Sequence, residues 1–137
     1  MSNIELLEKT LPVAPLKIVA MESCRGLGQK VNDYIVSFRE NTINEVSESS
    51  LYVNYKSNNY LVDCCCPRFG TGEAKGILRE TIRGTDLFIM TDVCNYSLTY
   101  TVSGHLNHMS PQHHYQALTR IISPATGKAK RINEIMP

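Results

Sequence analysis

The sequence has no excess of charge of one sign, no long apolar run and no Cys-x-x-Cys pair. Fourteen Lys and Arg residues against thirteen Asp and Glu residues leave a formal net charge of +1. This balance gives no reason to expect binding to nucleic acid or to an anionic membrane. Apolar runs stay far below the roughly 20 residues of a membrane-spanning helix, and residues 1–10 lack the basic start and apolar core of a signal peptide. We therefore expect a cytoplasmic protein that holds any anionic ligand locally.

The five cysteines do not follow a disulfide or zinc pattern. Three of them, Cys64 to Cys66, are consecutive in a strand-like stretch, where neighbouring side chains point to opposite faces, so a disulfide framework is not expected. The alternative is a metal site that adds the four histidines of the chain: His105, His108, His113 and His114. That site would lack the Cys-x-x-Cys spacing of structural zinc centres. We favour reduced cysteines that serve as small apolar fillers, and we assign no metal ligand.

The length of 137 residues suits a single domain that owns a hydrophobic core. Residues 1–15 are expected to form an arm, because Pro12 and Pro15 stop the short amphipathic segment before them. Strand-like and helix-like patterns then alternate, which favours an α/β sheet. We expect a hairpin of two strands at 51–56 and 60–66, further strands at 16–21, 74–80, 86–93 and 131–137, and helices at 27–38 and 111–122. The strongly apolar strand at 86–93 is expected to be central and buried on both faces.

Spacings of three and four residues define the buried face of each helix. In the first helix the face consists of Leu27, Val31, Tyr34, Ile35 and Phe38. The second helix is expected to begin with Ser110 as N-cap and proline in the first helical position. Its inward residues are expected to be Tyr115, Leu118, Ile121 and Ile122. Between the helices, residues 95–108 are interpreted as a long connection of the kind that often carries function.

Two further patterns are weak. Gly26-Leu27-Gly28 stands where a strand turns into a helix, and its amides could cradle a phosphate. The other residues of a dinucleotide or P-loop fingerprint are missing, so a plain turn is favoured. His113 and His114 at the start of the second helix are interpreted as exposed residues rather than ligands.

The most informative segment is residues 67–92. It places an aromatic residue, Phe69, and a carboxylate, Glu73, in a loop punctuated by glycines. The chain then passes through the basic turn at residues 82–85 into the apolar strand. This arrangement is typical of a ligand-facing loop held on a rigid sheet. The residues alone leave open that Phe69 fills a gap in the core, and that Arg79 and Arg83 form a solvated basic edge.

The order of residues in this segment resembles the N-terminal half of ribose-phosphate diphosphokinases, also called phosphoribosyl pyrophosphate synthetases. The resemblance is carried by Arg68-Phe69, Gly72-Glu73, Arg83-Gly84, residues 86–89, Cys94 and residues 127–137. Residues 95–100 and 107–111 are similar to a divergent bacterial subgroup. The resemblance implies a phosphoribosyltransferase-like (type I) half-domain, with a mostly parallel sheet flanked by helices and an antiparallel hairpin.

The resemblance also implies a reaction. Family members use magnesium to transfer the β,γ-diphosphoryl group of ATP to ribose 5-phosphate, and we expect a homo-oligomer in which subunits share the adenine site. Phe69 would then stack on adenine, and Glu73 would accept a hydrogen bond from the exocyclic amine of the base. Thr71 stands where most members carry aspartate, and it would retain one hydrogen bond without the charge.

The family's groups for the ATP phosphates, magnesium and ribose 5-phosphate follow the strand at residues 131–137. We therefore expect an N-terminal domain that is incomplete at its C-terminus, with no catalytic residue, no metal ligand and no turnover by this polypeptide alone. The alternative function is a non-catalytic protein that assembles with complete synthetases and regulates them. A small metal-binding module that uses Cys and His is a third possibility.

Overall fold

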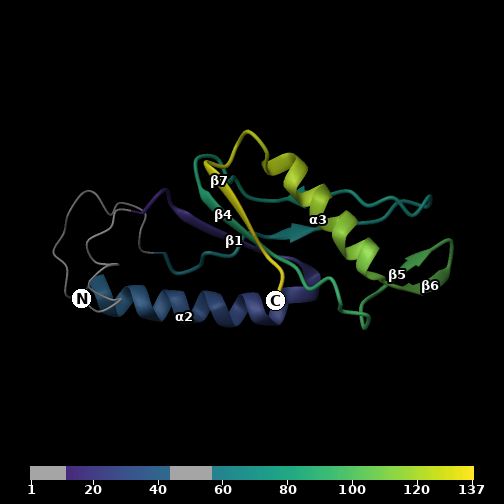
Figure 1. Ribbon diagram of the computed structural model, residues 1–137, viewed down its shortest axis with the longest axis horizontal. Coiled ribbons are helices and arrows are strands. Elements are labelled where there is room, and N and C mark those ends of the chain that lie inside the picture. The colour runs from purple at the N-terminus through teal and green to yellow at the C-terminus, as the bar shows by residue number, and fades with distance from the viewer. Residues whose placement is uncertain (1–11, 44–56) are drawn as a thin grey trace.

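The computed structural model describes residues 12–43 and 57–137 (Figure 1). The elements, in chain order, are β1 (Leu16–Ala20), the 3-10 helix η1 (Glu22–Cys24), α2 (Arg25–Ile43), β2 (Cys64–Cys65), β3 (Ile77–Leu78), β4 (Asp86–Met90), β5 (Thr99–Val102), β6 (His105–His108), α3 (Pro111–Ala125) and β7 (Arg131–Ile135). The predicted arm up to residue 11 and the predicted strand at 51–56 lie outside the described residues.

A parallel sheet in the order β1-β4-β7 forms the centre of the fold. In β4, Leu87 and Ile89 are fully buried and pack with Leu118 and Ile121 of α3. Met90 is buried in a second cluster, to which α2 contributes partly buried apolar residues. The two helices thus lie on opposite faces of the sheet (Figure 1). This confirms the α/β half-domain and the central, doubly covered strand.

The strand expected at residues 60–66 divides into an isolated bridge at Leu61 and the short strand β2. Its first part runs beside β1, where Ile18 N donates to Tyr60 O and Val62 N donates to Ile18 O, both at 2.8 Å. Its second part, β2, pairs antiparallel with β3. One antiparallel hairpin of the described structure therefore spans residues 64–78, and the strand expected at 74–80 shortens to β3.

The predicted buried face of α2 is wrong at two positions. Leu27 is exposed and Tyr34 is 72% exposed, whereas Gly28 and Asn32 are buried. A Cβ at Gly28 would overlap the side chain of Ala20 in β1, and Asn32 Oδ1 accepts the amide of Tyr60 at 2.8 Å. The helix α2 therefore approaches the sheet through Gly28 and Asn32. A prediction that searches only for apolar residues at helical spacing does not identify either of them.

The start of α3 at Ser110 and Pro111 is confirmed, since the Ser110 side chain accepts from His113 N. The helix continues to Ala125, and its buried side consists of His114, Ala117, Leu118, Ile121 and Ala125. Tyr115 is 57% exposed, so its predicted inward position is wrong. The first buried turn instead carries His114, whose ring Nε2 lies 2.6 Å from the carbonyl oxygen of Asn95.

Residues 95–108 contain a hairpin rather than only an irregular connection. β5 and β6 pair antiparallel around Ser103 and Gly104, whose φ angles are 50° and 79°. Two consecutive positive φ values match the twist of a two-residue hairpin. The β5–β6 hairpin projects at the N-terminal end of α3 (Figure 1). Neither helix of the described residues combines the length and apolarity that crossing a membrane requires.

We predict that Gly76→Ala destabilises the protein, because Gly76 lies directly against the backbone of α3. A Cβ there would overlap the carbonyl group of Arg120. Overpacking of this kind lowers the free energy of unfolding by about 1–3 kcal/mol, which urea denaturation measures. The control is Gly70→Ala in the same hairpin, since no described atom lies within 4 Å of a Cβ there. Equal losses in the two variants would contradict the close approach.

Candidate functional site

The candidate site is the tip of the hairpin that spans residues 64–78. Above the β2–β3 pair, Lys75 N donates to Pro67 O and Phe69 N donates to Glu73 O, both at 2.9 Å. The turn closes with Gly72 N donating to Phe69 O at 2.8 Å. Gly72 has a φ of 87°, which L side chains rarely adopt and which explains a glycine at this position. The predicted ligand loop is thus a hydrogen-bonded hairpin tip.

The three predicted site residues lie together on this tip. Phe69 is 54% exposed, so the alternative that it fills a gap in the core is wrong. Thr71 is exposed at the turn. Glu73 lies across from Phe69, and its carboxylate Oε1 accepts a hydrogen bond of 2.7 Å from Arg120 Nη2 of α3. The tip presents one aromatic face, one hydroxyl and one carboxylate to solvent.

Arg68 ties the base of the tip to β5. Its Nη1 donates to Gly72 O at 2.8 Å, and its guanidinium lies 4.4 Å from the centroid of the Tyr100 ring. A guanidinium over an aromatic face is attracted by the negative charge density of the ring. The sequence pattern did not identify Tyr100, because it treated residues 95–108 as a connection. The alternating Thr-Tyr-Thr-Val run before Ser103-Gly104 is the signal that predicts this hairpin.

His113 joins the same network from α3. Its Nδ1 accepts the Ser110 amide at 3.1 Å, and its Nε2 lies 3.4 Å from the Tyr100 hydroxyl. Burial lowers the pKa of His113, and the nearby Arg68 and His114 lower it further. A neutral ring that carries its proton on Nε2 suits both contacts. The interpretation of His113 and His114 as exposed residues is therefore wrong, since His113 is half-buried and His114 is buried.

A cavity of about 250 Å³ lies between the hairpin that spans residues 64–78 and the β5 strand. Its walls come from the turn after β1, from β2, from β5 and from α3. Burial raises the pKa values of the Cys64 and Cys66 thiols to about 11, so both are neutral near pH 7. Cys24 is also buried, but Cys94 is exposed and is not a core filler. Among the described residues, no three His, Cys, Asp or Glu side chains gather into a metal site.

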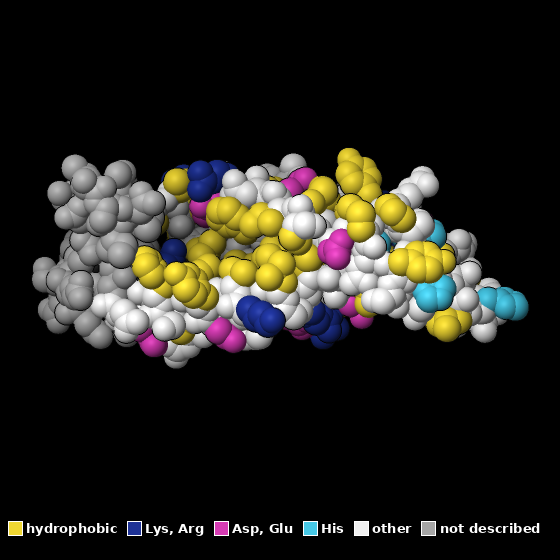
Figure 2. Space-filling view, turned by 60° about the horizontal axis from the view of Figure 1, so that its bottom comes forward, with side chains coloured by type: hydrophobic (Ala, Val, Ile, Leu, Met, Phe, Trp, Pro, Cys, Tyr) yellow, Lys and Arg dark blue, Asp and Glu magenta, His cyan; other side chains and the backbone are white. Residues whose placement is uncertain are grey.

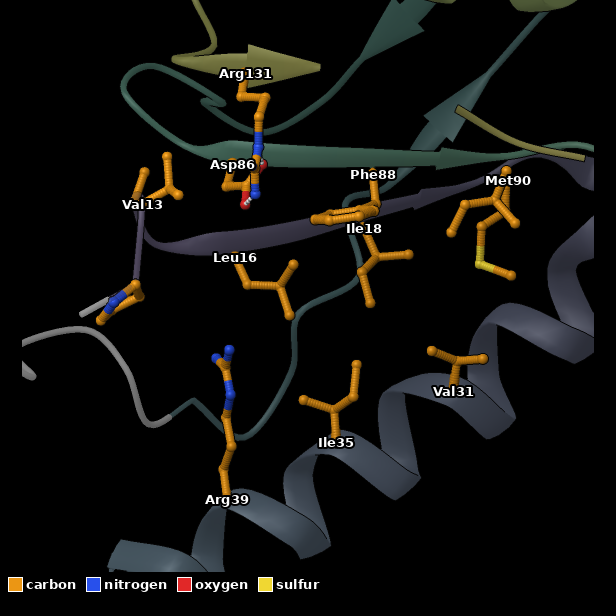
Figure 3. Close-up of a pocket in the computed structure, with 13 residues that line it drawn as sticks. Val13, Leu16, Ile18, Val31, Ile35, Arg39, Asp86, Phe88, Met90 and Arg131 are labelled. Carbon is orange, nitrogen blue, oxygen red and sulfur yellow. Dashed lines mark hydrogen bonds and ion pairs between the residues drawn. The ribbon is translucent and has the colours of Figure 1, made fainter. Parts of the chain in front are cut away.

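A larger cavity, of about 470 Å³, opens between α2 and the opposite face of the sheet. Leu16, Ile18 and Phe88 line it from the sheet, and Val31 and Ile35 face them from α2 (Figure 3). Hydrophobic side chains gather along this hollow on the surface (Figure 2). This cavity and α3 lie on opposite faces of the sheet. The hairpin that spans residues 64–78 contacts α3 and is therefore separate from the cavity.

The parallel sheet, its two covering helices and the antiparallel hairpin define a phosphoribosyltransferase-like half-domain. A family model described as the N-terminal domain of ribose phosphate pyrophosphokinase matches residues 16–137. The chain therefore belongs to the ribose phosphate pyrophosphokinase family, through its N-terminal domain. No curated protein matches the chain.

We predict that the protein loses stability as the pH falls through about 6.5, the pKa of an unperturbed histidine. The folded state lowers the pKa of His113. As the pH falls, the unfolded state therefore binds this proton first, and protonation stabilises it relative to the folded state. The contribution of His113 to stability is complete above the pKa that it has in the unfolded state, and this contribution declines as the pH falls below that value. Urea unfolding at about pH 7.5 and about pH 5.5 measures the difference.

His113→Gln provides the comparison, because glutamine completes a capping box without titrating. The decline with pH should be smaller in this variant than in the wild type. His105→Gln, at an exposed position of β6, serves as the control and should keep the wild-type decline. If the stability of His113→Gln depended on pH as that of the wild type does, His113 would not be the cause of the decline.

Proposed function

We propose that the hairpin tip binds the adenine end of ATP, within a protein that transfers a diphosphoryl group to ribose 5-phosphate. Phe69 stacks on the base, and Glu73 accepts a hydrogen bond from the exocyclic amine. The observation that carries this proposal is the exposure of Phe69 on an ordered tip, opposite a carboxylate. An exposed aromatic face beside an acceptor is the pair of groups that an aminopurine needs.

The chemistry of the tip favours adenine over guanine. Glu73 Oε2 has no hydrogen-bond partner among residues 12–43 and 57–137, so it is available to the amine. A carboxylate that accepts an N–H forms a charge-assisted hydrogen bond. Guanine carries a carbonyl oxygen at the same position, and two acceptors repel each other. Thr71 adds one hydroxyl at the edge of the site, which can donate or accept.

The other parts of the reaction need groups beyond this tip. We propose that a second subunit completes the adenine site, since the tip is exposed. Magnesium belongs with the phosphates of ATP, and we assign it no ligand because the described residues hold no suitable group of three. Ribose 5-phosphate likewise has no assigned residue. This polypeptide alone is therefore proposed to bind the nucleotide without completing the transfer.

We predict that Phe69→Ala weakens ATP binding about 10-fold, within the range measured for loss of one base–aromatic stack. Amide chemical shifts of the 137-residue chain, followed by NMR during titration with ATP, report the affinity and the place of binding. In the wild type the shifts should concentrate at residues 67–75. Phe69→Tyr keeps an aromatic face and should retain most of the affinity.

Tyr96→Ala is the matched control, because Tyr96 is also an exposed aromatic residue but stacks on His108 of β6. It should bind ATP as the wild type does. Titration with GTP tests the role of the amine and should give a clearly lower affinity. Equal ATP affinity in the wild type and Phe69→Ala would refute the stacking role.

We also predict that the chain alone forms no phosphoribosyl pyrophosphate from ATP, magnesium and ribose 5-phosphate. The physical reason is that the transfer depends on positioning and neutralising the phosphates. Quantifying AMP release by chromatography checks this, with an active family member as positive control. Steady production of AMP that requires ribose 5-phosphate would contradict the prediction.

A further inference from the structure

The ion pair between Glu73 and Arg120 joins the hairpin tip to α3. Arg120 Nη2 lies 2.7 Å from Glu73 Oε1, and the two residues are 47 positions apart in the chain. Arg120 lies next to Ile121, which is fully buried in the core. The cation therefore extends from a firmly packed helix, whereas the carboxylate belongs to a projecting tip.

A second contact brings the same two segments together. Gly76, three residues beyond Glu73, lies so close to α3 that a Cβ would overlap the carbonyl group of Arg120. The backbone of α3 thus supports the hairpin at Gly76, and the Arg120 side chain reaches the tip at Glu73. Two independent features, a missing Cβ and an ion pair, fix the tip at one position along α3.

We propose that Arg120 is the positioning residue for Glu73, an inference that rests on the proposed adenine site. Arg120 occupies Oε1 and orients the carboxylate, which leaves Oε2 for the exocyclic amine of adenine. A free glutamate side chain samples many rotamers, and ordering it on binding costs affinity. The planar guanidinium restricts those rotamers before the ligand arrives.

The exposure of the pair separates a positioning role from a structural one. The Arg120 and Glu73 side chains are 42% and 55% exposed, and exposed ion pairs contribute little to global stability. Arg120→Met removes the charge and retains an unbranched side chain. This variant should therefore remain folded. Its effects should be confined to the tip and to recognition of the base.

The first measurement needs no nucleotide. Hydrogen exchange followed by NMR reports the opening of the tip at the amides of Phe69 and Gly72, which donate within the turn. We expect about two- to fivefold faster exchange in Arg120→Met, the range that an exposed ion pair supports. Arg120→Lys should restore part of the protection. The charge exchange Glu73→Arg with Arg120→Glu should also restore protection, because it re-forms the pair in the opposite sense.

The second measurement is the preference for adenosine over inosine, which has a carbonyl oxygen in place of the amine. These nucleosides carry no phosphate, so a direct contact between Arg120 and phosphates cannot contribute. We expect the preference in Arg120→Met to fall about two- to fivefold and in Arg120→Lys to recover partly. The double variant Glu73→Arg with Arg120→Glu should recover the slow hydrogen exchange of the wild-type tip. It should nevertheless lose the preference for adenosine, since arginine at position 73 has no hydrogen-bond acceptor.

Unchanged exchange rates in Arg120→Met would overturn the inference. Faster exchange with an unchanged preference would also overturn it, because Arg120 would then hold the tip without orienting Glu73 for the base. A different failure is possible for the proposed function itself. If adenosine shifts no amide of the wild-type tip, the adenine site and the positioning role both fall, while the exchange rates still show whether Arg120 holds the tip.

Discussion

The pairing of β4 with a strand on each side is the constraint on which the rest of this structure depends. At its start, the Asp86 carboxylate accepts hydrogen bonds from Arg131 Nε at 2.8 Å and from Asn133 Nδ2 at 2.9 Å, both on β7. These contacts fix the register of the two strands, and a slip by one residue would exchange the two faces of β7. With the register fixed, Leu87 and Ile89 face α3. The position of α3 then determines where the hairpin can rest.

The hairpin tip is exposed, yet contacts from several elements hold it. Gly76 rests on the backbone of α3, Arg120 reaches Glu73 from the same helix, and Arg68 lies over Tyr100 of β5. His113 contacts Tyr100 in turn and caps the start of α3. The polar and aromatic groups of the tip are therefore arranged before any ligand binds. Such preorganisation lowers the entropy lost on binding.

Sequence patterns predicted the elements whose cause is local. The Ser110-Pro111 start of α3 and the apolar β4 strand were both identified correctly, because capping and continuous burial leave signals in neighbouring residues. The outward positions of Tyr34 and Tyr115 were missed for another reason. Gly28 lies against Ala20 of β1 on the inward side of α2, and His114 contacts Asn95 O on the inward side of α3. Such long-range contacts leave no local periodicity. For Phe69, Thr71 and Glu73, the structure establishes shared exposure on one tip, while their ligand stays a prediction.

Thr71 stands where the resemblance to the family leads us to expect an aspartate, and the charge at the tip gives this difference a physical meaning. A tip with two carboxylates would place two negative charges near a nucleotide that is itself anionic. Here Thr71 is neutral, and the one carboxylate, Glu73, is already paired with Arg120. These three side chains therefore carry no net charge. In the proposed ATP site, such a tip would repel the phosphates less than a tip with two carboxylates. Under the proposed function, recognition of the base depends on the Phe69 ring and on one carboxylate oxygen of Glu73. The orientation that Arg120 gives to this carboxylate then matters more than it would in a tip with two acidic residues.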